Sequence, residues 1–291
     1  MNHLALHLCL ALGLILSNFF QSAHAQDMEL PRPSPKAMVM QRMGIADIEV
    51  AYSSPGVKGR EIWGGLVPYD ELWRTGANAA TKLSVSRAIM VEGEQLPAGH
   101  YALFTIPGQN TWTLVINEEW EQWGTGSYEE EKDVLRVEVE PQKTERMQER
   151  LIFKFDLQDN QTGDLVLAWE HLRLPIDIEV PVIDQAMASI EGTLEQYNRK
   201  WMALRDAADF CLDYDVKHEQ AMAWVEQSIE MEKDFSNMWV KARLLARQED
   251  YPKAIKVAQK AQPMLSEKSE GYREFYEAQL LSSINKWEGL R

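Results

Sequence analysis

The spacing of apolar residues changes at Pro181, and this change is the feature that most constrains the fold. From Asp47 onward apolar and polar residues alternate, so that Ile48, Val50 and Tyr52 fall on one side of an extended chain. Successive side chains of a strand point to opposite faces, so this alternation predicts half-buried strands. It returns at residues 112–116, 135–139, 151–157, 165–169 and 176–180. After Pro181 apolar residues recur three and four apart, which is typical of helices.

Turn residues separate the predicted strands. Examples are Pro97-Ala98-Gly99, Pro107-Gly108-Gln109-Asn110 and Asp159-Asn160-Gln161-Thr162-Gly163. Residues 26–180 are therefore predicted to form an antiparallel β-sandwich or partly open barrel, followed by an α-helical region at 181–291. Pro175 and Pro181 predict that the last strand lies at a sheet edge, because proline cannot donate to a ladder of hydrogen bonds.

The first 25 residues are predicted to be a secretory signal peptide. They contain no Asp, Glu, Lys or Arg, and an apolar run from Leu4 to Phe20 ends before Ala23-His24-Ala25. The run is short for a membrane span, and the small residues suit cleavage before Gln26. An uncleaved anchor is the alternative. Only Cys211 then remains in the mature chain, so we expect an exported, most simply periplasmic, protein without an intramolecular disulfide or a membrane span.

The helical region contains an internal similarity at a spacing of 33 residues. His218-Glu219-Gln220-Ala221 aligns with Tyr251-Pro252-Lys253-Ala254 when the chain is shifted by this amount. The pattern resembles tetratricopeptide repeats, in which small residues occupy the close approach of two helices. Two repeats are fewer than the three or so that are stable alone, so the helices are expected to pack on the sandwich or on another chain.

The composition and the motifs of the chain exclude several functions. The net charge of −15 opposes nucleic-acid binding, because no basic patch interrupts it. The remaining histidines, His100, His171 and His218, are isolated, and neither a metal-binding pair nor a G-x-S-x-G nucleophile motif is present. We therefore predict no metal, no cofactor and no catalytic residue, and we interpret Cys211 as a packed core thiol.

The segment from Ser53 to Thr81 follows neither period. It is rich in aromatic and aliphatic residues, which is the opposite of a disordered composition, so we expect an ordered loop. Pro68 suits the first position of a helix and Gly76 its C-terminal cap. A short helix from Tyr69 to Thr75 is therefore predicted.

Several blocks of this region resemble the domain-of-unknown-function family 2911. The resemblance rests on Ser54-Pro55, Val57-Lys58-Gly59-Arg60, Trp63-Gly64-Gly65-Leu66-Val67-Pro68-Tyr69, Trp73-Arg74-Thr75-Gly76-Ala77-Asn78-Ala79-Ala80-Thr81, Pro97-Ala98-Gly99 and Tyr101-Ala102-Leu103-Phe104-Thr105-Ile106-Pro107. It runs from about residue 34 to residue 180 and implies an exported bacterial envelope protein, with no established reaction. Ala79 departs from the pattern, since an acidic residue is expected there.

The loop offers the side chains of a polar-ligand site. Flat aromatic faces combined with directional polar groups are what orient a small polar ligand. The predicted ligand-binding residues are Arg60, Trp63, Tyr69, Trp73, Arg74, Asn78 and Thr81. The alternative is structural: the tryptophans would close the end of the sandwich, and Arg74 would pair internally with a carboxylate such as Glu92.

A second cluster surrounds Trp120 and Trp123 and is strongly acidic. It comprises Glu118, Glu119, Glu121, Glu129, Glu130, Glu131 and Asp133. Paired carboxylates can serve glycoside hydrolysis or calcium binding, but the acidic spacing of an EF-hand is missing. We therefore interpret this stretch as a solvated loop.

Three functions follow from these observations. The leading hypothesis is a non-enzymatic binding protein for a small polar or carbohydrate-like ligand, with Arg74 as anchoring donor, Asn78 as orienting amide, and Trp63 and Trp73 as stacking walls. The second is a hydrolase of envelope glycans that uses Glu61, Asp70 or Glu92. The third is a scaffold whose C-terminal helices bind a protein partner.

Overall fold

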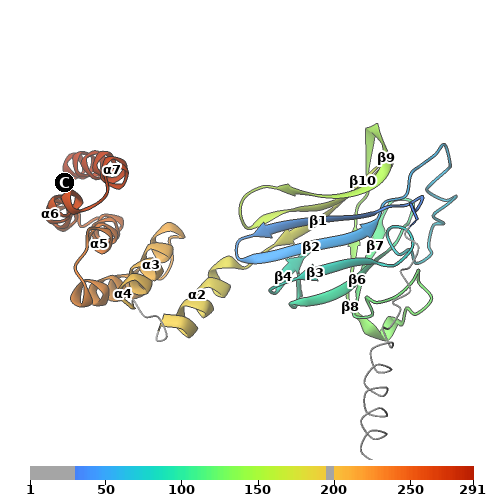
Figure 1. The fold of residues 1–291 in the computed structure, drawn as a ribbon, viewed down its shortest axis with the longest axis horizontal. Helices are drawn as coiled ribbons and strands as arrows, with labels where there is room; N and C mark the ends of the chain where they lie inside the picture. Colours follow the sequence, from blue (N-terminus) through green and yellow to red (C-terminus); the bar gives the residue numbers. More distant parts are fainter. Residues whose placement is uncertain (1–29, 195–199) are drawn as a thin grey trace, which may run out of the picture.

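The computed structural model describes residues 30–194 and 200–291, in which two antiparallel sheets precede six α-helices (Figure 1). The predicted signal peptide lies outside these residues. The strands are β1 (Lys36–Met43), β2 (Ala46–Ser53), β3 (Thr81–Val85), β4 (Ile89–Val91), β5 (Glu94–Leu96), β6 (Gly99–Ile106), β7 (Trp112–Asn117), β8 (Asp133–Val139), β9 (Gln142–Leu157) and β10 (Thr162–Glu179). The helices are α2 (Val182–Thr193), α3 (Lys200–Asp213), α4 (His218–Met231), α5 (Phe235–Arg247), α6 (Tyr251–Ala261) and α7 (Glu270–Gly289).

The two sheets enclose one hydrophobic core, which confirms the predicted sandwich followed by helices. One sheet has the strand order β1-β2-β3-β6-β7-β8 and the other β5-β4-β10-β9. The inward residues predicted from the alternation, such as Ile48 and Val50 on β2, are fully buried. They pack in the same cluster as Leu165 and Leu167 of the opposite sheet. Burial of apolar surface between the sheets is therefore what holds the sandwich together.

The prediction that the last strand is an edge is wrong. Residues 162–179 form a single strand of 18 residues, β10, with β9 on one side and β4 on the other. The pairing with β9 ends at Arg173, and the pairing with β4 begins at Ile178. Pro175 lies between these stretches, so its missing N–H costs no ladder bond. A register shift around Glu170, which has a φ of 56°, bends the strand.

The predicted helix from Tyr69 to Thr75 is also wrong, because this backbone pairs with the end of β6 instead. Trp73 and Thr105 exchange two backbone hydrogen bonds, at 2.8 and 2.9 Å, and the Asp70 amide donates to Pro107 O at 2.8 Å. Asp70 and Thr75 both have positive φ values, which a right-handed helix does not allow. The loop is ordered, as predicted, but by tertiary pairing.

Helix α2 links the sandwich to the other helices. Gly44, in the β1–β2 turn, approaches Val182 so closely that a Cβ there would lie 2.1 Å from its Cγ2. Helices α4 and α6 begin 33 residues apart, and Ala221 and Ala254 at the fourth position of each are fully buried. Cys211 is fully buried, as predicted. Among the described residues, no helix has the length and apolar character needed to cross a bilayer.

Candidate functional site

Four indoles from the loop and both sheets gather at the end of the sandwich remote from α2. The ring centre of Trp63 lies 5.8 Å from that of Trp73, 4.8 Å from Trp112 and 5.7 Å from Trp169, each in an edge-on arrangement. Trp73 is only 8% exposed, and its Nε1 donates to Gly76 O at 3.1 Å. Aromatic pairs of this geometry stabilise a core beyond their buried area. Trp73 is therefore a core residue that stabilises the fold.

Two further predicted site residues fasten the loop to the sheet. The Thr81 hydroxyl is fully buried and donates to Thr75 O at 2.8 Å. The Asn78 amide donates to Ser34 O and to Ser53 Oγ, both at 3.2 Å. These bonds fix the backbone on either side of Ala79 and Ala80.

The two predicted arginines differ in environment. Arg60 is exposed, and its guanidinium donates to the backbone carbonyls of Gly56 and Val57. Arg74 is partly buried; desolvation lowers the pKa of its guanidinium, and its Nε has no hydrogen-bond partner. The predicted pairing with Glu92 is not found. Glu92 lies in the β4–β5 turn, where its carboxylate accepts from the Asp177 amide at 2.7 Å.

The remaining predicted residues, Trp63 and Tyr69, line a cavity of about 360 Å³ at this end of the sandwich. Its other walls include Lys143 and His171, whose Nδ1 lies 3.1 Å from Thr144 O. The structure thus divides the predicted set. Trp63 and Tyr69 share one cavity, and Trp73 and Thr81 are buried in the framework. Arg60 and Asn78 form hydrogen bonds within the loop or to the segments beside it, and Arg74 is partly buried.

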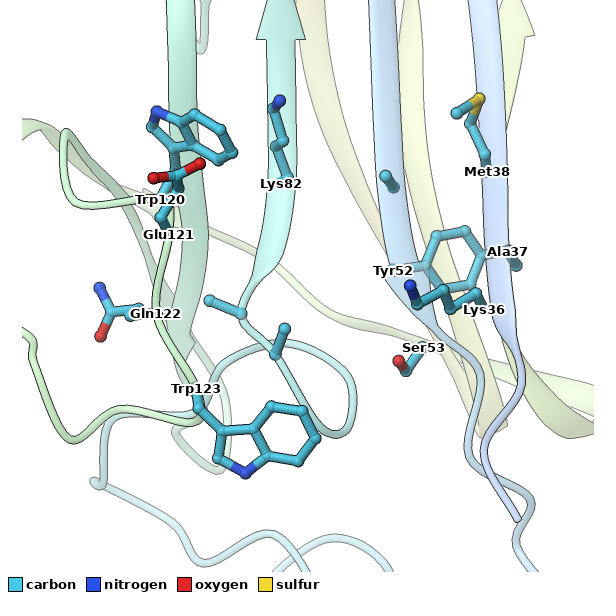
Figure 2. Close-up of a pocket in the computed structure, with 13 residues that line it drawn as sticks. Lys36, Ala37, Met38, Tyr52, Ser53, Lys82, Trp120, Glu121, Gln122 and Trp123 are labelled. Atoms are coloured by element: carbon cyan, nitrogen blue, oxygen red, sulfur yellow. The ribbon is translucent and has the colours of Figure 1, made fainter. Parts of the chain in front are cut away.

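A larger groove, of about 630 Å³, lies on the outer face of the six-stranded sheet (Figure 2). Its lining is mostly apolar and includes both ends of the 53–81 loop. The lining residues are Lys36, Ala37, Met38, Ala51, Tyr52, Ser53, Ala79, Ala80, Lys82, Trp120, Glu121, Gln122 and Trp123. A volume of this size suits a small organic ligand. We call it the outer groove.

Strand register forms the floor of the outer groove. Met38 of β1 pairs with Ala51 of β2, and Ala51 pairs with Lys82 of β3. Neighbouring strands lie about 4.8 Å apart, so the alanine leaves a valley between two longer side chains. One step along, Lys36 pairs with Ser53, which is small as well. Figure 2 shows Lys36 and Met38 on one side of the valley and Lys82 with Trp120 on the other.

Residues 120–123 form the wall of the outer groove. Lys82 Nζ lies 3.8 Å from the ring centre of Trp120, a cation–π contact. The backbone of the wall is attached to the loop, because the Ala80 amide donates to Gln122 O at 3.0 Å and the Gly124 amide to Asn78 O at 3.0 Å. Trp123 stands at the lower end in Figure 2 and is 64% exposed. Exposure of this much of an indole ring to water is unfavourable. A ligand that covers the ring would remove this unfavourable hydration.

A buried carboxylate anchors the wall to the sheet. Asp133 accepts hydrogen bonds from Asn117 Nδ2, Tyr128 Oη and Arg136, each at 2.8 Å. Burial and the bond to Asp133 raise the pKa of Tyr128 to about 12. Lys132 pairs with two of the glutamates, and most of the others are exposed. In the described residues no group of His, Cys, Asp and Glu side chains is arranged to hold a metal ion.

The sequence reasoning did not identify Trp120 and Trp123 as site residues. The sequence did contain an indication of this site, because Trp120 and Trp123 lie within a run of glutamates and tryptophans are unusual in a fully solvated loop. The remaining site residues, such as Ala51 and Lys82, come together only through strand register.

One comparison with known proteins found a similarity, and it covers the sandwich. Residues 34–178 match the family described as "Protein of unknown function (DUF2911)", which supports the resemblance found in the sequence. All residues that line the outer groove lie inside the matched segment. A comparison with curated proteins gave no significant match, and neither did a comparison with solved structures.

Proposed function

We propose that this DUF2911-matching sandwich is a non-enzymatic binding module and that the outer groove is its ligand site. The observation that carries the proposal is an open, largely apolar groove of about 630 Å³ with the exposed indole of Trp123 at its end. Ligand sites are typically concave, predominantly apolar and provided with a few polar groups. The outer groove has this composition, with Lys36, Lys82 and Glu121 as its charged members.

The lining of the outer groove favours binding over hydrolysis. A glycan hydrolase needs two carboxylates about 5 to 9.5 Å apart. Among the described residues that line the groove, Glu121 is the single carboxylate. Of the carboxylates considered from the sequence, Glu61 and Asp70 are exposed in the loop, and Glu92 lies in the β4–β5 turn.

The loop supports the groove in this proposal. Asn78 holds the backbone beside Ala79 and Ala80, and Trp73 and Thr81 fix the ends of the segment that carries them. The small polar or carbohydrate-like ligand expected at the loop has its best place in the 360 Å³ cavity, where Trp63 and Tyr69 line the wall. That cavity is the second candidate site.

The proposal also includes the cellular location of the protein. We infer export to the periplasm after cleavage before Gln26; the mass of the mature protein recovered from a bacterial host tests this.

The helices are proposed to be tetratricopeptide-like and to bind a protein partner. The 33-residue spacing of α4 and α6 supports this, as does Phe275 on α7, which is 61% exposed.

Binding of the dye anilinonaphthalene sulfonate, which fluoresces on apolar surfaces, tests the outer groove. We expect one dye per chain. Ala51→Trp fills the valley from the outer face of β2, where a large aromatic residue suits a strand, and should abolish binding without lowering the melting temperature. Phe275→Ala removes an exposed apolar residue of α7 and should leave binding unchanged. Undiminished dye binding by a folded Ala51→Trp protein would contradict the proposal.

A further inference from the structure

The charged side chains that line the outer groove are mainly basic, although the protein as a whole is acidic. The chain as a whole carries a net charge of −15. At the groove, Lys36 and Lys82 lie on opposite ridges of the valley, and the Arg32 guanidinium lies 5.8 Å from the ring centre of Trp123. Glu121 is the one acidic side chain of the lining. The lining itself holds two lysines against one carboxylate, and with Arg32 beside Trp123 this gives a small local excess of positive charge over an apolar floor.

The uncharged hydroxyl and amide groups of the groove are largely engaged within the protein, although Gln122 Oε1 is buried without a hydrogen-bond partner. Ser53 Oγ accepts from Asn78 at 3.2 Å, and Gln122 Nε2 donates to Glu119 O. In Figure 2 the Gln122 amide points away from the valley. A neutral sugar needs several directional hydrogen bonds to replace those it makes with water. The groove offers apolar surface and cations instead.

The apolar surface continues along β1 beyond the groove. Met38 and Met40 stand on the outer face of this strand and are 64% and 58% exposed. Met38 lines the groove with Ala51, Ala79 and Trp123, and Met40, which is paired with Glu49 of β2, extends the apolar edge along β1. Methionine side chains adapt readily to flexible apolar ligands.

From these observations we propose that the ligand of the outer groove is a single-chain anionic amphiphile, free in solution, of which a fatty acid is the simplest case. The proposal rests on the function proposed above and names the class of ligand for that site. The anionic group lies between Lys36 and Lys82, and the chain lies on the apolar floor. No bond is made or broken.

Isothermal titration of the full mature chain with decanoate tests the proposal, with decyl maltoside as a neutral ligand of equal chain length and maltotriose as a sugar without a chain. We expect decanoate to bind one per chain, more tightly than decyl maltoside, and maltotriose not to bind. Lys36→Gln and Lys82→Gln should each weaken decanoate binding about three- to fivefold, because exposed ion pairs contribute modestly, and high salt should do the same. Lys256→Gln, on the exposed side of α6, is the matched control and should have no effect.

The outcomes separate this inference from the proposed function. If decyl maltoside binds as tightly as decanoate and the lysine variants have no effect, or if maltotriose is the better ligand, the anionic class is wrong while the groove remains a binding site. Binding to phosphatidylglycerol vesicles but not to decanoate would also overturn the inference, in favour of a membrane surface. If decanoate binding persists in both Ala51→Trp and Ala79→Trp, the site lies elsewhere and both proposals fail.

Discussion

The wall of the outer groove depends on Asp133, and removing this carboxylate should destabilise the sandwich and impair the groove together. The Asp133 side chain is 10% exposed and accepts 2.8 Å bonds from Asn117, Tyr128 and Arg136. Hydrogen bonds to a shielded charge contribute about 1.5–3 kcal/mol each, but Asn117 and Tyr128 keep other partners. The pair with Arg136 is partly exposed and contributes less than about 1 kcal/mol.

Asp133→Ala should therefore lower the free energy of unfolding by about 2–4 kcal/mol. For a domain of this size that corresponds to a fall of roughly 6–14 °C in melting temperature. The assay is thermal unfolding followed by near-ultraviolet circular dichroism. Dye binding at the outer groove should weaken as well, because the wall carries Trp120 and Trp123.

Asp156→Ala is the matched control, since this carboxylate forms an exposed ion pair with Lys154 on its own strand. It should change the melting temperature by no more than about 2 °C, as expected for a surface ion pair. Equal melting temperatures for the Asp133→Ala and wild-type proteins would refute the idea that this carboxylate holds the wall.

Three further predictions follow from other parts of the chain. Gly44→Ala should cost more stability than Gly93→Ala, by about 1–3 kcal/mol in urea unfolding, because both positions have positive φ but only Gly44 faces Val182; equal costs would contradict this. Asp234→Ala removes the capping box of α5 and should lower helical stability by about 1–2 kcal/mol, measured by circular dichroism at 222 nm; an unchanged transition would speak against the cap. Since the pKa of Tyr128 is raised to about 12 in the folded protein, its stabilising contribution is complete below pH 10 and lost as the pH rises from 10 to 12; Tyr128→Phe should reduce this alkaline loss, and an identical pH profile would count against the shift.

The architecture was predicted correctly from the sequence wherever apolar residues recur at a single regular spacing. The alternation at Ile48, Val50 and Tyr52 marks the buried face of β2, because a strand with one buried face must place apolar residues at every second position. The change of period at Pro181 likewise coincides with the start of α2 at Val182.

Two predictions that depended on neighbouring residues alone were wrong, because tertiary contacts determine the local structure there. Pro68 and Gly76 are compatible with a short helix, but pairing between Trp73 and Thr105 gives this backbone better partners. Pro175 suggested an edge, but it lies in a gap between two pairing partners of β10. The pairing partners of these two segments, β6 for the loop and β4 and β9 for β10, cannot be identified from the residues next to the segments in the sequence.

The candidate site was only partly predictable for the same reason. The loop residues were recognised as ordered and interacting, and Trp73, Asn78 and Thr81 do make specific contacts, but these contacts are internal. The outer groove requires Met38, Ala51 and Lys82 to be neighbours, and only the register of three strands brings them together.

Ligand binding in the outer groove can be observed directly in a methyl NMR spectrum of methionine-labelled protein, recorded with and without the dye or decanoate. Met38 lines the outer groove, whereas Met43 is buried in the core and Met238 in α5. We expect the Met38 methyl signal to shift on ligand addition, while the signals of Met43 and Met238 stay in place. An unchanged Met38 signal at saturating ligand would show that the ligand binds elsewhere.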